Sequence, residues 1–403
     1  MERINARLAE VRSPQRVRRI ASFDQTEIWW EIEGPPAALP EPLGRHDLAA
    51  TALIFKAMEA GRDLHIEGPV SRSLLASLEE FVVCWTLWRP DLYKAVRISA
   101  DAECPDTPNG VRFPRLAIAA CSGGVDSSFT IWRHITGQAS RNTRELGAAL
   151  FVHGLDIPLA NEQQYEDAFA AAADTMASVN VPLVKMRTNW RDVASTVWQM
   201  EFGAGLSTCL RHWQGSFGTA LIGSGEDYAH LGLPWGSNPI TFAMLSSRDF
   251  EIVLDGSGFG RTAKVQGIGE WPESLANLRV CWQNASSTAN CGRCEKCVRT
   301  KLNFKAVGLT LPPSLAGEPT IRQILSLRAR NAMQVFQLQD ILNFSKAKGG
   351  IAPWGRAMQF AIAWNYLLNL VKRVKTRLFG SRWSKRRRAE MKSRGASSPG
   401  SGE

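Results

Sequence analysis

Four cysteines between residues 281 and 297 have the spacing of a metal site. Cys281 is followed, after nine residues, by the tight segment Cys291-Gly-Arg-Cys294-Glu-Lys-Cys297. Four thiolates suffice for a closed tetrahedral zinc site, and Gly292 relieves crowding where the segment turns back on itself. The same four ligands also suit an iron–sulfur cluster. We expect a structural Zn²⁺ bound by these cysteines, with an iron–sulfur cluster as the alternative.

A second segment that could do chemistry is the glycine turn, Cys121-Ser-Gly-Gly-Val-Asp-Ser-Ser128. Gly123 and Gly124 allow successive N–H groups to converge on one point, and a helix starting there adds partial positive charge. The turn lacks the lysine and the spacing of G-x-x-x-x-G-K-[ST], which disfavours a kinase or a GTPase. The alternative is an ordinary strand-to-helix turn capped by serine and aspartate. We expect the turn to bind phosphate, through residues Ser122, Gly123, Gly124, Val125, Asp126, Ser127 and Ser128.

Five further charged residues are candidates for the same site. Arg261 and Lys264 could neutralise charge near a phosphate group, and Asp156 follows an apolar run where parallel sheets place ligand groups. Glu226 and Asp227 could bind Mg²⁺ or substrate. For each residue the alternative is a surface charge or a loop cap. We expect Asp126, Lys264 and Arg261 to be catalytic, and the other three to contribute to nucleotide binding.

Short apolar runs alternate with helical segments around these motifs, which predicts an α/β fold with a doubly wound parallel sheet. We expect strands at 116–120, 148–152, 183–186, 220–222 and 251–254, and helices at 125–135, 164–179 and 204–217. Ahead of them we expect a strand at 26–33, helices at 48–60 and 71–87, and a strand at 94–100. The predicted division is an N-terminal α+β domain (1–112), a domain with the glycine turn and the cysteine site (113–310), C-terminal helices (311–371) and a tail (372–403).

Composition supports a folded protein with its basic charge at one end. The 403 residues are 44% hydrophobic and 21% charged, which excludes wholesale disorder. No run of about 18 apolar residues and no secretory signal are evident, so we expect a cytoplasmic protein. The net charge is +10, and residues 372–394 alone hold eleven Lys or Arg against one acid. The rest of the chain is therefore formally neutral.

The basic tail follows an apolar segment, 358–371, that contains Trp364 and Tyr366. A helix there would place aromatic and cationic side chains together, which suits an anionic membrane surface. Nucleic acid is a second potential partner of the basic residues. We expect a solvated tail behind a helix that docks on the core, with the membrane and nucleic acid as alternatives.

The glycine turn resembles the loop of the pyrophosphate-loop ATP pyrophosphatase superfamily. The cysteine spacing that follows it is similar to that of the 7-cyano-7-deazaguanine synthase family of the queuosine pathway, as are Gly223–Asp227, Arg261-Thr-Ala-Lys264 and Arg299. The resemblance covers about residues 115–308. It implies a sheet of the adenine-nucleotide alpha-hydrolase type with a four-cysteine zinc knot. It also implies that the turn holds the β,γ-pyrophosphate of ATP with Mg²⁺.

The expected function is therefore an ATP-dependent synthase that releases AMP and pyrophosphate. It would activate a carboxylate or amide, on a small molecule or a macromolecule, for attack by ammonia or an amine. One alternative is a sulfur-transferring RNA modification enzyme, which needs a reactive cysteine of lowered pKa. The other is a nucleotide-sensing scaffold without turnover. A homodimer is a further expectation.

Overall fold

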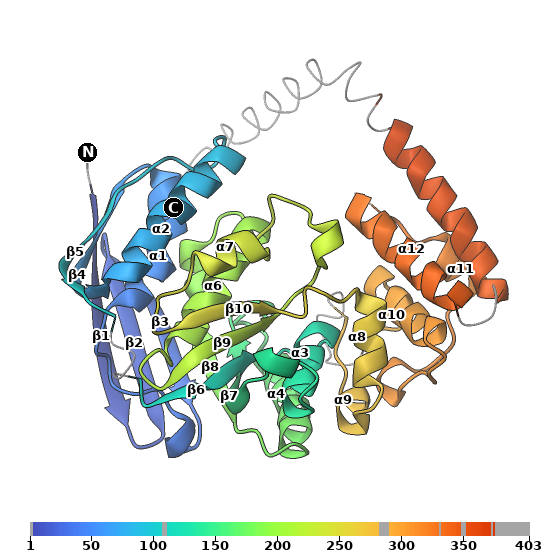
Figure 1. Ribbon diagram of the computed structural model, residues 1–403, viewed down its shortest axis with the longest axis horizontal. Helices are drawn as coiled ribbons and strands as arrows, with labels where there is room; N and C mark the ends of the chain where they lie inside the picture. The colour runs from blue at the N-terminus through green and yellow to red at the C-terminus, as the bar shows by residue number, and fades with distance from the viewer. Residues whose placement is uncertain are drawn as a thin grey trace, which may run out of the picture. The chain divides into compact units, whose positions relative to one another are not determined.

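A ten-stranded, mostly parallel sheet forms the centre of this α/β protein (Figure 1). The computed structural model describes residues 3–106, 111–281, 290–329, 332–347, 352–371 and 374. The chain divides into two units, Met1–Pro319 and Thr320–Glu403. In the sheet the strands lie in the order β10-β9-β6-β7-β8-β3-β2-β1-β4-β5. Their bounds are β1 Arg3–Ser13, β2 Arg16–Phe23, β3 Thr26–Glu33, β4 Asp63–Ser71, β5 Ile98–Cys104, β6 Phe113–Ala120, β7 Glu145–His153, β8 Leu183–Thr188, β9 Phe217–Gly223 and β10 Glu251–Asp255.

The five strands β6 to β10 are parallel, and β6 lies between β7 and β9. Their apolar runs are buried because helices cover both faces of this half of the sheet. One core contains Ala119 of β6 and Tyr165 of α4, and the other contains Ile118 of β6 and Leu210 of α6. The helices are α1 Asp47–Ala60, α2 Arg72–Trp88, α3 Val125–Ile135, α4 Glu162–Ala177, α5 Trp190–Ala194, α6 Trp198–Arg211, α7 Pro239–Ala243, α8 Arg261–Ile268, α9 Pro272–Ala276 and α10 Glu295–Ala306.

The N-terminal strands extend the same sheet. β3 pairs antiparallel with β8, with Ile32 opposite Met186. β1 and β2 bury every second side chain, as expected for strands with one face on the core. The structure therefore differs from the predicted division at residue 112, because residues 3–104 share a sheet and a core with the parallel strands.

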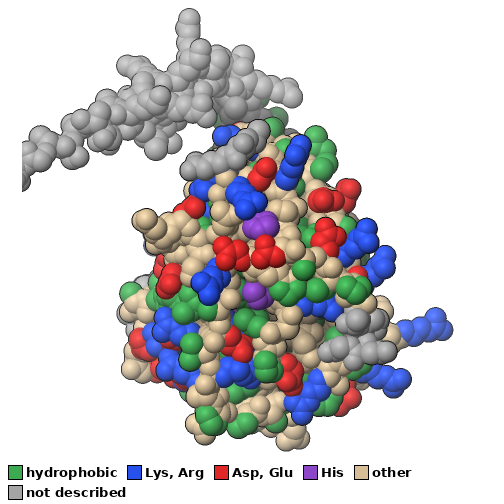
Figure 2. All heavy atoms as spheres, turned by 90° about the vertical axis from the view of Figure 1, so that its left-hand side faces the viewer, with side chains coloured by type: hydrophobic (Ala, Val, Ile, Leu, Met, Phe, Trp, Pro, Cys, Tyr) green, Lys and Arg blue, Asp and Glu red, His purple; other side chains and the backbone are tan. Residues whose placement is uncertain are grey.

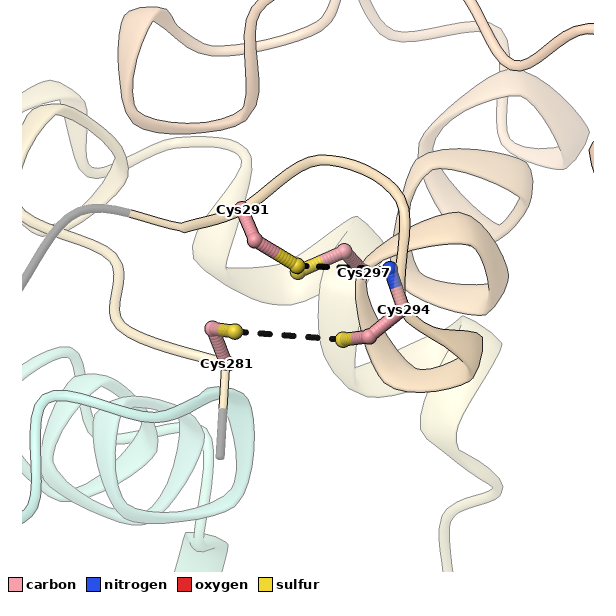
Figure 3. Close-up of side chains that lie close together, drawn as sticks. All are labelled: Cys281, Cys291, Cys294 and Cys297. Carbon is pink, nitrogen blue, oxygen red and sulfur yellow. Dashed lines mark hydrogen bonds between the residues drawn. The ribbon is translucent and has the colours of Figure 1, made fainter. Parts of the chain in front are cut away.

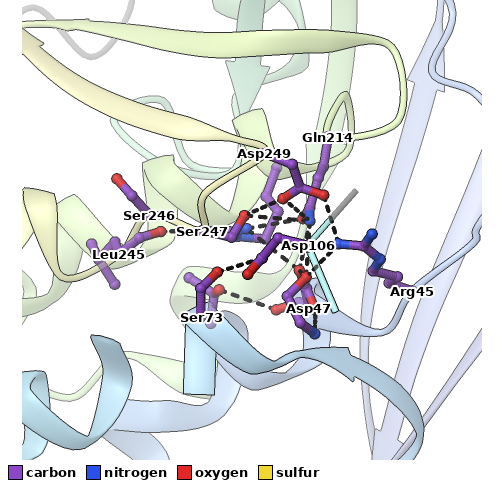
Figure 4. A network of polar contacts seen from close by, with 12 residues as sticks. Arg45, Asp47, Ser73, Asp106, Gln214, Leu245, Ser246, Ser247 and Asp249 are labelled. Atoms are coloured by element: carbon purple, nitrogen blue, oxygen red, sulfur yellow. Dashed lines mark hydrogen bonds and ion pairs between the residues drawn. The ribbon is translucent and has the colours of Figure 1, made fainter. Parts of the chain in front are cut away.

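A buried polar network also joins the N-terminal residues to the parallel strands (Figure 4). Asp47 accepts hydrogen bonds from the Ser71 N–H at 2.7 Å and from Gln214 Nε2 at 2.6 Å. Arg45 forms an ion pair of 2.6 Å with Asp249, which precedes β10. A cavity of about 560 Å³ lies beside the network, and two pairs of its lining charges are ion pairs, Arg112 with Glu41 at 2.5 Å and Arg45 with Asp249.

On the face that carries the N-terminal strands, basic and acidic side chains are intermixed (Figure 2). His65 lies 3.0 Å from Asp101, and Arg72 lies 3.7 Å from Glu103. This mixture agrees with the charge distribution of the sequence, in which the basic excess is confined to residues 372–394.

Most predicted elements of unit 1 are confirmed, although helices α5 and α7 to α10 were not among those expected. β1, β2 and β4 were not expected either, because the buried Arg19 of β2 and the exposed Val11 of β1 break the alternation and Gly68-Pro69 interrupts β4. Helix α6 begins and ends six residues before the predicted 204–217. The last predicted N-terminal strand lies at 98–104 rather than 94–100.

Unit 2 is helical, as predicted, although its first helix begins only at residue 321. It contains α11 (Ile321–Leu325), α12 (Ala332–Ala347) and a helix over 353–371. Asn365 donates to the Leu327 carbonyl and accepts from the Ala329 N–H, both at 2.9 Å. The predicted tail, 372–403, lies outside the described residues apart from Val374. Among the described helices, none has the length and apolarity needed to cross a membrane.

Candidate functional site

The glycine turn lies where the strand order reverses. It follows β6, whose neighbours β7 and β9 lead the chain to opposite sides of the parallel half. In open α/β sheets this position, at the carboxyl ends of the strands, is where ligands bind. Gly223 ends β9, and a Cβ atom added there would lie 2.5 Å from the Asp126 carbonyl oxygen. The turn after β6 and the loop after β9 therefore touch through their backbones.

The conformation of the turn explains its glycines. Gly123 has φ +70°, and Gly124 is the N-cap of α3. Ser127 Oγ accepts from the Ser122 N–H at 3.2 Å and lies 3.1 Å from Ser122 Oγ. Ser122 is exposed and both glycines are half-buried, so the turn has an open side. The side chains of Val125, Ser127 and Ser128 are buried.

Asp126 is enclosed by cations from α8. Its Oδ2 atom lies 2.9 Å from Arg261 Nη1, and its Oδ1 atom lies 3.6 Å from Lys264 Nζ and accepts no hydrogen bond. Burial opposes ionisation of this carboxyl, but Arg261 and Lys264 outweigh it and hold the pKa of Asp126 below its usual value. Asp126 is thus in contact with Arg261 and Lys264, the other two predicted catalytic residues, which follow it by 135 or more positions in sequence.

Three more cations interact with Asp126 or with the exposed Asp156. Lys296 and Arg299 lie on α10, and each interacts electrostatically with Asp126 and Arg261. Arg279 interacts with Asp156, as does Lys296. Partial burial lowers the pKa of Arg279 and Lys296, and full burial lowers that of Arg299.

Five cations gather beside the glycine turn. Their acidic partners include Asp126, Asp156 and Glu295, which lies 3.0 Å from Arg299, and Asp255 interacts with Lys264. Cys281 and Cys294 also interact with Arg279 and Arg299. Several cations in a partly buried place beside an open turn are typical of a site for a multiply charged anion. We refer to Arg261, Lys264, Arg279, Lys296 and Arg299 as the cation cluster.

Two predicted nucleotide ligands do not join the cation cluster. Glu226 accepts from the Gly232 N–H at 3.0 Å, and burial raises its pKa. Asp227 accepts from the Ala229 N–H at 3.0 Å and pairs with His230 at 2.7 Å. In the described residues both carboxylates thus stabilise the loop after β9, which is the loop-cap alternative for these positions.

The four predicted metal ligands meet in one place (Figure 3). Their sulfur atoms all lie within 4.8 Å of one another, with Sγ–Sγ distances of 3.8 Å for Cys281–Cys294 and 3.9 Å for Cys291–Cys297. Burial favours the thiol of Cys291, but N–H groups of Arg293 and Cys294 outweigh it and lower its pKa to about 6. This four-cysteine cluster could therefore hold a metal ion such as zinc.

The four-cysteine cluster adjoins the two segments that carry Arg279, Lys296 and Arg299. Arg279 lies two residues before Cys281, and its N–H donates to the Gly123 carbonyl at 2.8 Å. Cys294 is the N-cap of α10, which carries Lys296 and Arg299. A metal ion that joins Cys281 to Cys294 would consequently fix Arg279 and α10 against the glycine turn.

Two members of the cation cluster, Arg279 and Lys296, were not singled out from the sequence. Only their positions in the sequence could have pointed to them, because Arg279 lies two residues before Cys281 and Lys296 directly precedes Cys297. Arg299 entered only through the family resemblance, and its position beside Asp126 is a finding of the structure.

No protein-family model matches this chain, and neither a curated protein nor a solved structure matches it. A function must therefore be inferred from the geometry of the cation cluster and the four-cysteine cluster.

Proposed function

We propose that the protein is an ATP-dependent adenylating enzyme whose glycine turn and cation cluster hold the pyrophosphate portion of ATP. The observation that carries the proposal is the cation cluster. Five cations gather beside an open glycine turn at the switch point of the sheet. We further propose, from the sequence resemblance, that the parallel half is a sheet of the adenine-nucleotide alpha-hydrolase type.

The reaction would place an acceptor oxygen on the α-phosphorus of ATP and release pyrophosphate. Charge then accumulates on the departing phosphate oxygens, where buried cations stabilise it most effectively. N–H groups of the glycine turn would bind the outer phosphates, and Arg261 and Lys264 would neutralise the charge that develops. Ammonia or an amine would next displace AMP from the activated carboxylate or amide.

Asp126 offers a carboxylate oxygen that fits Mg²⁺ at the same site. Asp126 Oδ1 is a buried carboxylate oxygen without a hydrogen-bond donor, and Mg²⁺ prefers such ligands. Asp126 would hold the ion, which would supply further neutralisation of the phosphate oxygens.

For the four-cysteine cluster we propose a structural Zn²⁺. Sulfur atoms bound at about 2.3 Å to one tetrahedral ion lie about 3.8 Å apart. The distances of 3.8 and 3.9 Å in this structure are close to that value. A four-iron cluster would bind each cysteine through a different iron atom and would separate the sulfurs further.

Two observations favour adenylation over sulfur transfer. Burial raises the pKa of Cys121 to about 11, and it also raises the pKa of Cys209. Both thiols are therefore protonated at neutral pH, whereas a sulfur carrier attacks as a thiolate. Burial also raises the pKa of the partly exposed Cys84.

The test is the fate of ATP. Full-length protein is incubated with ATP, Mg²⁺ and either deazapurine carboxylates or a small-molecule fraction of a cell lysate, and the nucleotide products are separated. We expect AMP and pyrophosphate. ADP and phosphate would refute the proposal, and ATP binding without any product would favour the nucleotide-sensing scaffold.

A matched pair of variants connects that reaction to the cation cluster. Lys296→Met removes a cluster cation, and Lys305→Met removes a lysine of the same helix that pairs with Glu318 at 2.6 Å. A charge-assisted contact contributes about 1.5–3 kcal/mol, so Lys296→Met should weaken ATP binding roughly 10- to 100-fold. Lys305→Met should leave the affinity unchanged. Equal affinities for the two variants would place the nucleotide elsewhere.

A further inference from the structure

The helix over 353–371 exposes an apolar stripe on the side that faces away from its core. Met358, Ala361 and Asn365 form its buried side. The opposite side carries Phe360, Trp364, Leu367 and Val371, which are between 41% and 63% exposed. Their spacing of three or four residues places them in one row along the helix. We call these four residues the apolar stripe.

The outer side departs from that of an ordinary surface helix, which is polar. Tyr366, Leu368 and Leu370 are exposed on either side of the apolar stripe, and no charged residue occurs between positions 357 and 371. A contiguous exposed apolar surface of this kind marks an interaction site.

The residues that follow indicate which surface the apolar stripe meets. Positions 372–394 contain eleven Lys or Arg and one acid. An apolar row with aromatic side chains, adjoined by a polybasic segment, combines two attractions that an anionic lipid surface satisfies together. Nucleic acid would satisfy the basic residues but offers little to Leu367 and Val371.

We propose that the apolar stripe and the basic residues after it bind the surface of an anionic lipid bilayer. The helix lies in the interface with the stripe toward the acyl chains, and the lysines and arginines contact the headgroups. This proposal does not depend on the ATP chemistry, and its failure would leave that chemistry untouched.

The experiment is co-sedimentation of the full chain with vesicles of phosphatidylcholine, alone or with about 30% phosphatidylserine, at several salt concentrations. We expect binding to the anionic vesicles that weakens as salt rises, because screening reduces the attraction of the basic residues. Trp364→Glu should lower the bound fraction at least tenfold. Gln359→Glu adds the same charge to an exposed position of the helix outside the stripe and should have a much smaller effect.

A second variant tests the basic residues directly. Replacing Lys385, Arg386, Arg387 and Arg388 with serine should reduce binding to anionic vesicles and leave the helical circular dichroism signal unchanged. Equal binding of Trp364→Glu and Gln359→Glu would overturn the proposal, as would the absence of vesicle binding. Salt-sensitive retention of RNA without vesicle binding would assign the basic residues to nucleic acid. A dimer dissociated by Trp364→Glu, again without vesicle binding, would assign the stripe to a second copy of the chain.

Discussion

Replacing Gly223 with alanine tests whether the loop after β9 fixes the glycine turn. A Cβ atom at this position would lie 2.5 Å from the Asp126 carbonyl oxygen and 3.0 Å from the Ser127 nitrogen. Both contacts are with backbone, so no side-chain rotation relieves them. Gly223 has an ordinary φ, and alanine therefore brings no conformational strain of its own.

The size of the effect follows from the overlap. Ordinary contacts begin at 3.4 Å, so the start of α3 and the end of β9 must separate by about 1 Å. Overpacking of this kind costs about 1–3 kcal/mol of the free energy of unfolding, which corresponds to a decrease in Tm of roughly 1.5–5 °C for a unit of this size. A displacement of about 1 Å near reacting groups can lower the rate of reaction roughly 100-fold.

The assay compares Gly223→Ala with Gly225→Ala, a change two residues further along where an added Cβ has no neighbour within 4 Å. Thermal unfolding and ATP binding are measured for both variants and for the wild type. We expect Gly223→Ala alone to lose stability and ATP affinity. If the two variants behaved alike, the close approach of the two loops would be refuted, together with our account of how the turn is positioned.

Three further predictions concern the rest of unit 1. Cys294→Ser should abolish metal content and leave this unit unfolded or aggregated, because structural zinc contributes about 10–16 kcal/mol of apparent binding energy. Cys104→Ser is the control. A soluble, metal-free and active Cys294→Ser variant would contradict the prediction. Burial raises the pKa of Glu59 to about 7, so ionisation of this carboxyl lowers the free energy of unfolding as pH rises from about 4.5 through 7. The Glu59→Gln variant should therefore have a higher Tm than the wild type at about pH 8 and the same Tm at about pH 4. The opposite pH trend would count against the raised pKa. Asp47→Ala should lower the free energy of unfolding, measured by urea denaturation, by about 3–5 kcal/mol, because it leaves the donors of Ser71 and Gln214 unpaired. A loss below about 1 kcal/mol would mean that the polar network is dispensable.

The sequence was most informative where one local pattern determines one local structure. Apolar runs such as Leu116–Ala120 predicted buried parallel strands, and the Ser122–Ser128 segment predicted a turn into a helix. The close spacing of Cys291, Cys294 and Cys297 predicted a shared site because a short chain cannot carry them far apart. It was least informative for β1 and β2, where the buried Arg19 and the exposed Val11 break the apolar alternation.

Contacts between distant segments could not be read from local patterns. The pairing of β3 with β8, which places the N-terminal strands in the same sheet as the glycine turn, joins residues more than 150 positions apart. Arg279 and Lys296 carry no sequence signature of their own, and they face Asp156 only because α10 and the segment before Cys281 converge beside the turn. The sequence by itself thus determined the chemical groups and their local turns. The tertiary structure alone decided which charges share one partly buried space, because that depends on chain crossings that local patterns do not encode.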